Sequence, residues 1–352
     1  MRIAQIAPLT ESVPPQRYGG TERVVAYLTN ELVSLGHDVT LFASGDSRTT
    51  ATLVPSWPLA LRLGPDCRDP LAPHLVMLED VFRRAREFDV LHFHVSELHF
   101  SLARRLDVAH VTTLHGRLDM PELGALYREF RDIPVVSISD AQRRPLPGAS
   151  WIDTVYHGLP LKLFEFHPGP GEYLAFIGRI SPEKRVDRAI AIARACGRKL
   201  RIGAKVDAAD RDYFEREVRH LLADPLVDYV GEVDDAAKEE LLRGALALLF
   251  PIDWPEPFGL VMIEALACGV PVVAFPGGSV PEVIDHGVTG FVVDSIDEAV
   301  AAVHAAGRLD RRQCRAVFER RFSAPRMAAD YVAIYEALVS RRAAPLATGA
   351  AS

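Results

Sequence analysis

The chain has 352 residues, 49% of them hydrophobic, and a formal net charge of −7, which is typical of a soluble globular protein of about two domains. A mildly acidic chain is not a general nucleic-acid binder. No apolar run reaches the length of a membrane span and no signal-peptide pattern opens the sequence, so we expect a cytoplasmic protein. The four cysteines form no C-x-x-C pair, which argues against a disulfide framework or a cysteine zinc site.

The first half of the sequence alternates short β-branched runs with segments of helical spacing. The expected helices include Thr21–Leu35 and Leu98–Leu106. The expected strands are Ile3–Ala7, Val39–Ala43, Val90–His94, Val111–Leu114 and Val135–Ser139. This alternation predicts a parallel sheet covered by helices.

The second half repeats that order. Its expected strands are Tyr173–Ile177, Leu200–Gly203, Val227–Val230, Leu246–Phe250, Val270–Ala274 and Phe291–Val293. Proline and glycine cluster between the halves. We therefore predict two Rossmann-like, doubly wound α/β domains. The predicted boundaries are an acceptor-side domain at 1–160, a linker at 161–171, a donor domain at 172–320, a C-terminal helix packing back toward the first domain at 321–340, and a disordered tail at 341–352.

Ligands of doubly wound sheets bind beyond the carboxyl ends of the strands, so we expect a site in strand-to-helix loops, in a cleft between the domains. One such loop ends in Gly19 and Gly20, just before an amphipathic helix. Two glycines let the backbone approach an anion, and the free N–H groups of the helix point at it. A phosphate seat and a tight turn that needs glycine for its own shape are equally open here, and the pattern is not a G-x-G-x-x-G fingerprint.

A second loop carries cations. Arg179 and Lys184 follow a predicted strand and precede the predicted helix Val186–Cys196. Arginine offers a planar fork and lysine a mobile point charge, a combination that suits a diphosphate. A solvated basic loop is the alternative, which the position directly behind a strand disfavours.

Histidines gather at the ends of two predicted strands. His92 and His94 share a strand face, and with Glu97 or His115 they could imitate a metal site. Such pairs at strand ends more often make hydrogen bonds, so we expect no metal. His115 ends a strand and precedes Gly116, which places it to touch a sugar hydroxyl or a developing charge.

The run W-P-E-P-F-G-L-V-M-I-E-A-L-A-C-G-V-P-V-V-A contains two carboxylates, Glu256 and Glu264, among apolar or small residues. Prolines put Glu256 in a loop, and helical composition puts Glu264 within a helix. A buried glutamate needs a hydroxyl pair or a cation, and spacing alone leaves a ligand contact and a structural salt bridge equally open. The helix start could bind a phosphate or carboxylate through the backbone of Phe258, Gly259 and Leu260.

This run resembles the Glu-x7-Glu motif of retaining glycosyltransferases with the two-domain GT-B fold, in particular family 4. The resemblance covers roughly residues 1 to 335, with its motifs in the right order. The other matching segments are Gly19-Gly20, Gly178-Arg179 with Lys184, Gly277-Gly-Ser-Val-Pro-Glu282 and Gly287-Val-Thr-Gly-Phe291.

The resemblance implies that Glu256 contacts the donor sugar and that Glu264 holds the ribose hydroxyls of the nucleotide. Arg179 and Lys184 would neutralise the diphosphate leaving group, and His115 would lie near the sugar. Backbone contacts to the donor are implied for Gly19, Gly20, Phe258, Gly259, Leu260 and, beside the base, Val233.

The implied reaction transfers a hexosyl group from a UDP or GDP sugar to an acceptor hydroxyl with retention of the anomeric configuration, and needs no metal or other cofactor. A front-face, dissociative route, in which the departing phosphate helps to take the acceptor proton, is favoured over a covalent intermediate. The acceptor is left open among a glycan, a lipid-linked sugar and a small molecule. Nucleic acid is not an expected partner, and membrane association is not indicated, although peripheral contact stays open.

Two positions depart from the family pattern. The segment Tyr156-His157-Gly-Leu-Pro160 replaces the usual Asn-Gly-Val-Asp, and Arg185 replaces the glycine that usually follows the phosphate lysine. The alternative functions are a GT-B nucleotide-sugar epimerase or hydrolase and a non-catalytic sugar-nucleotide-binding module.

Overall fold

The computed structural model describes residues 1–16, 19–64 and 67–343, and it divides the chain into two compact units. The first unit comprises Met1–Ile138, Pro145–Gly158 and the segment from Ala324 onward. The second unit comprises Ser139–Arg144 and Leu159–Ser323. Each unit is thus assembled from segments that are not contiguous in the sequence.

Within the described residues of the first unit, seven parallel strands form one sheet in the order β3-β2-β1-β4-β5-β6-β7. The strands are β1 (Arg2–Ile6), β2 (Asp38–Ser44), β3 (Thr52–Trp57), β4 (Val90–Phe93), β5 (Ala109–Thr113), β6 (Val135–Ser137) and β7 (Trp151–Thr154). Sequence reasoning missed β3 and β7, the two edge strands. An edge strand is covered less than a central one, so its sequence lacks the continuous apolar run that marks a buried parallel strand.

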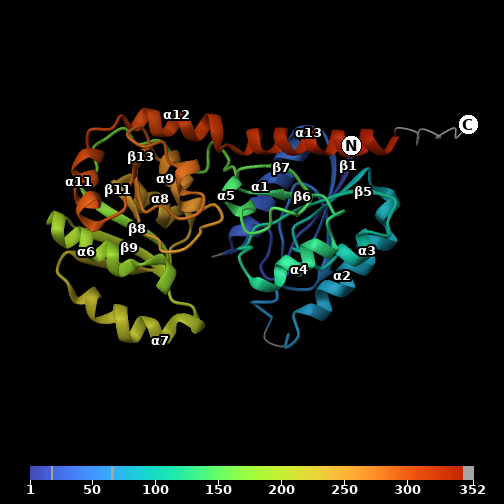
Figure 1. Ribbon diagram of the computed structural model, residues 1–352, viewed down its shortest axis with the longest axis horizontal. Coiled ribbons are helices and arrows are strands. Elements are labelled where there is room, and N and C mark those ends of the chain that lie inside the picture. Colours follow the sequence, from blue (N-terminus) through green and yellow to red (C-terminus); the bar gives the residue numbers. More distant parts are fainter. Residues whose placement is uncertain (17–18, 65–66, 344–352) are drawn as a thin grey trace, which may run out of the picture. The chain divides into compact units, whose positions relative to one another are not determined.

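The helices of the first unit include one from the far end of the sequence. They are α1 (Gly20–Ser34), α2 (Leu71–Arg83), α3 (Phe100–Ala103), α4 (Pro121–Glu129) and α13 (Ala324–Ala343), with a 3-10 turn at Ala85–Glu87. Figure 1 shows α13 alongside the first unit, where it packs against α1, β4 and β5. The predicted tail at 341–352 is corrected at its start because 341–343 still belong to α13, and its remainder lies outside the described residues.

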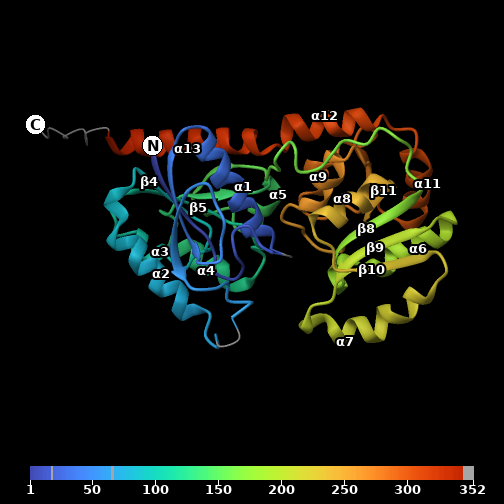
Figure 2. The same ribbon diagram turned by 180° about the vertical axis from the view of Figure 1, so that it is seen from behind.

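The described part of the second unit contains six parallel strands in the order β10-β9-β8-β11-β12-β13, with β8, β9 and β10 side by side in Figure 2. The strands are β8 (Tyr173–Arg179), β9 (Leu200–Lys205), β10 (Val227–Gly231), β11 (Ala245–Phe250), β12 (Val272–Ala274) and β13 (Gly290–Val292). All six were predicted.

The helices of the second unit are mostly short. The α-helices are α5 (Asp140–Arg143), α6 (Val186–Cys196), α7 (Arg211–Tyr213), α8 (Asp235–Arg243), α9 (Leu260–Ala267), α10 (Val280–Val283), α11 (Ile296–Ala306) and α12 (Arg311–Arg321). The other helical turns are Pro182–Lys184, Ala208–Asp210, Phe214–Val218 and Arg219–Ala223.

Both sheets change direction at an inner pair of strands. The order reverses between β1 and β4 in the first unit and between β8 and β11 in the second. Such a reversal leaves a crevice at the carboxyl ends of the two strands, and this crevice is where doubly wound sheets bind ligands. The fold therefore directs attention to the residues that follow β1, β4, β8 and β11.

Each sheet is buried against its own helices. Ile6, Phe42 and Phe93 lie in a core of the first unit, and Phe176 and Leu249 in a core of the second. Burying each such side chain contributes about 1.5–3 kcal/mol, which holds the strand ends in fixed positions. Among the described residues, the helices lack the combination of length and apolar composition needed to cross a bilayer.

Candidate functional site

Two cations lie at the carboxyl end of β8. Arg179 is the last residue of β8, rather than a loop residue as predicted, and Lys184 ends the 3-10 turn that follows. Arg185 then adopts a left-handed conformation with φ of 52° and leads into α6. The backbone thus turns sharply at the switch point of the sheet, with Arg179 at the carboxyl end of β8 and Lys184 just beyond it.

Arg179 is surrounded by carboxylates. Its Nη2 donates to Glu183 Oε1 at 2.7 Å, and its Nη1 lies 3.5 Å from Asp207 Oδ2 and 3.7 Å from Asp210 Oδ2. Burial raises the pKa of Asp210, an effect that the charge of Arg179 opposes. The guanidinium is therefore neutralised by acidic side chains of its own unit.

Lys184 is paired with the first glutamate of the motif. Its Nζ donates to Glu256 Oε2, and the same oxygen accepts the indole N–H of Trp254 at 3.0 Å. The ammonium also lies 5.0 Å from the Trp254 ring centroid and 5.5 Å from that of Phe250. The side chains of Lys184 and Glu256 are only 15% and 10% exposed, so the pair is largely shielded from water.

The loop that carries Glu256 is held by a second loop, Gly277–Ser279. Ser279 N donates to Glu256 O at 2.9 Å, and its Oγ donates to Phe258 O at 2.8 Å. Gly278 has φ of +56°, and a Cβ there would lie 2.1 Å from Glu256 O. Only glycine allows this approach, which explains why the Gly-Gly-Ser sequence accompanies the two glutamates.

Helix α9 begins one residue after Gly259, so Phe258 and Gly259 precede the helix and Leu260 is its first residue. Gly259 has φ of +79°, and a Cβ there would lie 2.8 Å from Met262 Cε. Phe258 is buried, which anchors the turn. Met262 N of the first turn donates to Gly259 O at 3.0 Å, and the N–H groups at the start of a helix, which lack a partner one turn back, can bind an anion.

Glu264 lies within α9 and is buried, and Lys238 of α8 binds it. Lys238 Nζ donates to Glu264 Oε1 and lies 3.2 Å from Asp235 Oδ1. Lys238 is the one described residue whose side chain binds this carboxylate. Of the two partners that the sequence left open for Glu264, the structure shows a cation.

Val233 lies just after β10 and packs on β9. A Cβ added to Gly203 of β9 would lie 3.0 Å from Val233 Cγ2, so the valine needs a glycine opposite it. This places the backbone that follows Gly231 at the carboxyl edge of the same sheet as Arg179.

Gly19 and Gly20 lie at the start of α1 in the first unit. Gly20 is the first helical residue and is exposed, and Gly19 precedes it. A Cβ at Gly19 would lie 2.8 Å from Pro15 Cβ, so this glycine also has a packing reason to be there. The turn therefore accounts for Gly19, and Gly20 is an exposed residue at the first position of α1.

His115 follows β5 in the first unit and is bound to His94. His115 Nε2 lies 2.9 Å from His94 Nδ1, and His94 Nε2 lies 2.8 Å from Gln5 Oε1. The ring stacks on His157 with centroids 5.3 Å apart. Burial lowers the pKa of His115 to about 3, so the ring is neutral near pH 7 and is not a general acid there.

The hydrogen-bond chain continues to α13. Gln5 Nε2 donates to the Tyr335 hydroxyl at 3.1 Å, which lies 2.6 Å from His92 Nδ1, and His92 Nε2 lies 2.7 Å from Thr113 Oγ1. Burial lowers the pKa of His92 and of His94 well below the usual range of histidine. These histidines thus join strands to α13 through neutral hydrogen bonds.

Sequence reasoning missed Lys238 and Trp254. Lys238 stands three and four residues before Leu241 and Leu242, so it shares their buried face, and that spacing is the signal that could have found it. Trp254 carried no signal beyond its place two residues before Glu256. In the second unit the structure brings Lys184 to Glu256 directly, while Glu264 and Arg179 have separate partners.

Comparison with known proteins identifies the family of the chain. The family described as Glycosyltransferase Family 4 matches residues 18–210, more than half of the chain, and the one described as Glycosyl transferases group 1 matches residues 164–313. The chain is 27% identical over 365 residues to a glycogen synthase of Mycobacterium tuberculosis (strain CDC 1551 / Oshkosh), covering 87% of each. It is also 27% identical over 359 residues to a phosphatidyl-myo-inositol mannosyltransferase of Mycolicibacterium smegmatis, covering 92% of this chain and 88% of that one.

Solved structures agree. AviGT4, a glycosyltransferase involved in avilamycin A biosynthesis, matches with a TM-score of 0.75 at 25% identity, covering 97% of this chain and 98% of that one. HepE of Anabaena in complex with UDP and glucose matches with a TM-score of 0.75 at 17% identity, covering 96% and 100%. The two parallel sheets, the Glu-x7-Glu motif around α9 and these likenesses lead to one conclusion: the chain belongs to glycosyltransferase family 4 and has the GT-B fold.

Proposed function

We propose that this glycosyltransferase moves a hexosyl group from a nucleotide-diphosphate sugar, with UDP and GDP sugars as the first donors to test, to an acceptor hydroxyl with retention of configuration and without a divalent metal. The observation that carries the proposal is the placement of Glu256 and Glu264 on either side of the α9 start, behind β11 at the switch point of the sheet. Doubly wound sheets bind nucleotides at such points.

Within the proposal, each group in the second unit meets one part of the donor. Glu256 binds hydroxyls of the sugar, Glu264 binds the ribose, and the backbone of Phe258, Gly259 and Leu260 meets the sugar and phosphate. Val233 lies beside the base. The burial of both glutamates supports these roles because a shielded carboxylate binds hydroxyls more strongly than an exposed one.

Arg179 and Lys184 would stabilise the charge that develops on the departing diphosphate. Fixed cations placed where negative charge develops are the largest source of rate enhancement in many enzymes, and here they would take the part that a metal ion takes elsewhere. Gly19 and Gly20 would add backbone contacts to the diphosphate, and a neutral His115 would contact the sugar by hydrogen bonding or packing. A front-face route then needs no carboxylate nucleophile.

A thermal-shift screen with UDP, GDP and ADP, free and as sugar conjugates, tests the donor class. A ligand at a hundred times its dissociation constant stabilises the protein by about 2.7 kcal/mol. We expect at least one nucleotide diphosphate and one of its sugars to raise the melting temperature. A null result with all of them at millimolar concentration contradicts the proposal.

The reaction itself needs two further measurements. NMR of the released or transferred sugar with the selected donor gives the anomeric configuration of the first product formed, and inversion would overturn the retaining assignment. Activity in excess EDTA should equal activity without it, whereas loss of activity that magnesium restores would show that a metal is required. Turnover to free sugar alone, for every acceptor tried, favours a hydrolase.

A further inference from the structure

The cations proposed to bind the donor diphosphate are already held by carboxylates. Arg179 faces Glu183, Asp207 and Asp210, and Lys184 is paired with Glu256. For Arg179, the acids are no part of the proposed sugar contacts. The acid paired with Lys184 is Glu256, which also binds the sugar in the proposed function. The Lys184 ammonium and the donor sugar would therefore compete for one carboxylate.

We propose that Glu256 is an internal competitor of the donor diphosphate: it holds Lys184 when the site is empty, gives Lys184 up when a diphosphate binds, and only then becomes free to bind the sugar. This inference rests on the proposed function and deepens it. Trp254 is assigned as a positioning residue, because its N–H keeps Glu256 Oε2 in place after Lys184 has left.

The contacts allow an exchange of partners in which a phosphate begins to bind the Lys184 ammonium before Glu256 leaves it. The Lys184 ammonium has three N–H donors, and among the described side chains it donates one hydrogen bond, to Glu256. The rings of Phe250 and Trp254 stabilise the cation without consuming a donor. A phosphate oxygen that approaches the 15% of the side chain still exposed can therefore take over the ammonium while the rings remain.

The exchange has a consequence for turnover. After transfer, the nucleotide diphosphate product no longer carries the sugar that held Glu256. The carboxylate can then return to Lys184 and compete with the product phosphates, which favours product release. The apparent affinity for the diphosphate is the intrinsic affinity multiplied by the fraction of sites in which Lys184 is free, as for any ligand that needs a minor state.

The experiment is isothermal titration calorimetry of the protein with UDP, GDP and ADP, without sugar. Glu256→Gln keeps the size of the side chain and an oxygen for the Trp254 N–H but removes the charge. We expect it to bind the nucleotide diphosphate selected by the wild-type protein about fivefold more tightly or better, although it has lost transfer activity. Glu172→Gln is the matched control, because it removes one carboxylate charge from an exposed position of the same unit and should not tighten binding.

The outcomes are distinct. Equal or weaker binding by Glu256→Gln overturns the inference, and so does equal tightening by Glu172→Gln, which would reflect net charge alone. A wild-type protein that binds none of the three nucleotides contradicts the proposed function instead. If Glu256→Gln does not fold, Glu256→Asp serves, since its shorter side chain should loosen the pair and tighten binding by a smaller factor.

A second readout follows Lys184 itself. The chain has three tryptophans, and Trp57→Phe with Trp151→Phe leaves Trp254 as the only one. Titration with inorganic diphosphate, which does not absorb in the near ultraviolet, should change the Trp254 emission as the ammonium leaves its ring. The change should be absent after Lys184→Gln, and its persistence there would overturn the exchange.

Discussion

The two units solve the problem of buried polar groups in different ways. In the first unit, histidines, a glutamine and Tyr335 form a largely buried chain of neutral hydrogen bonds from His115 to Thr113. In the second, lysines are paired with glutamates, Lys184 with Glu256 and Lys238 with Glu264. A neutral chain needs no counterion and holds elements in place, whereas a charged pair can exchange one partner for a charged ligand.

The largest effect is expected on the rate of transfer, when a charged residue proposed to stabilise the leaving diphosphate is replaced. Lys184→Met should lower the rate of transfer by a factor of about 10²–10³, the loss typical for one fixed group that stabilises developing charge. Steady-state kinetics with the selected donor measures it. Lys162→Met, at an exposed lysine of the same unit, is the control and should keep the wild-type rate. A Lys184 variant within threefold of wild type would remove this lysine from the mechanism.

Breaking the other charged pair should cost stability. Lys238→Met leaves Glu264 buried without a cation, and we expect the free energy of unfolding of the second unit to fall by about 3 kcal/mol. The double variant with Glu264→Leu should regain much of that loss, because it removes the uncompensated charge. Urea unfolding of the three proteins measures the effect, and a single variant as stable as wild type would show that Lys238 is dispensable.

Removing one group from the neutral chain of the first unit should cost less stability than breaking a charged pair of the second unit. Tyr335→Phe leaves His92 Nδ1 and Gln5 Nε2 without their shared partner, and it should destabilise the first unit by about 2 kcal/mol. Tyr331→Phe removes only the bond of 2.8 Å to Thr113 and should cost less. Hydrogen exchange of β1 and β4 amides reports the difference. An equal loss in both variants would mean that the chain is not organised around Tyr335.

The smallest expected effect is on the pH dependence of folding stability, to which the buried histidines of the first unit should contribute. A histidine whose pKa is lowered by folding binds fewer protons in the folded than in the unfolded state, so stability is full above the unfolded pKa of about 6.5 and falls as pH drops below it. With its pKa at about 3, His115 should account for about 1 kcal/mol of the loss between pH 7.5 and pH 5.5. His115→Asn should therefore lose that much less than wild type.

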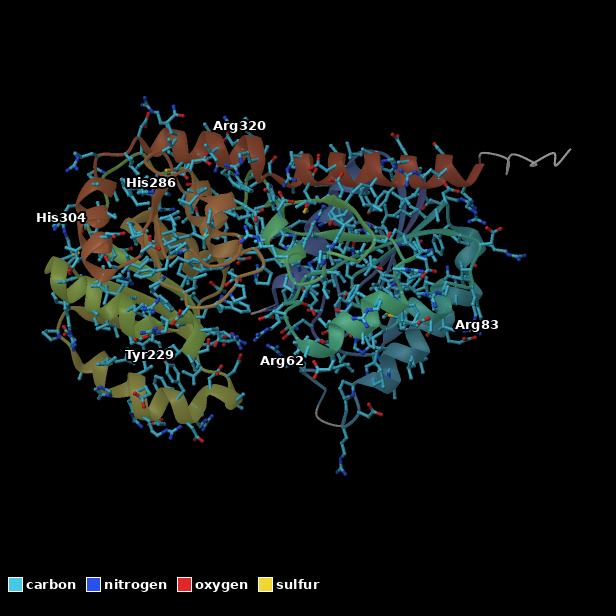
Figure 3. The ribbon with its side chains drawn as sticks, in the orientation of Figure 1. Arg62, Arg83, Tyr229, His286, His304 and Arg320 are labelled. Carbon is cyan, nitrogen blue, oxygen red and sulfur yellow. The ribbon has the colours of Figure 1, made fainter. Side chains whose placement is uncertain are left out.

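The control for this measurement lies on the outside of the second unit. His304, labelled in Figure 3, is an exposed residue of α11. His304→Gln should show the same dependence of stability on pH as the wild-type protein. A His115→Asn protein with that same dependence would argue that the ring of His115 is not neutral in the folded state.

The sequence predicted the architecture well because buried parallel strands leave continuous apolar runs, and the strands missed, β3 and β7, are edges. It also predicted the placement of Glu256 in a loop and Glu264 in a helix, from proline and composition alone. The sequence did not predict which cation pairs with Glu256 or with Glu264. Ion pairs such as Lys238 with Glu264 join α8 to α9 across 26 positions, and only the fold determines which helix faces which.

The roles implied for Glu256, Glu264, Arg179, Lys184 and the backbone groups stay predictions until the donor is identified. What the structure adds is the pairing of Lys184 with Glu256 and of Lys238 with Glu264. It also changes the interpretation of His115, which a strand-end position suggested as a partner for developing charge. Its neutral ring lies at the end of a chain of hydrogen bonds, because His115 Nε2 lies 2.9 Å from Nδ1 of His94, which follows the neighbouring strand β4.

Helix α13 constrains when the first unit can finish folding during synthesis of the chain. Its Tyr331 and Tyr335 complete the interior of a unit whose sheet is encoded in the first 154 residues. A ribosome adds about 5–20 residues per second, so that sheet must wait many seconds for the helix that fills it. Until then the polar chain around His92 lacks two of its hydroxyl groups. The second unit, which comprises Ser139–Arg144 and Leu159–Ser323, has its whole sequence available before α13 and can therefore be the first to fold.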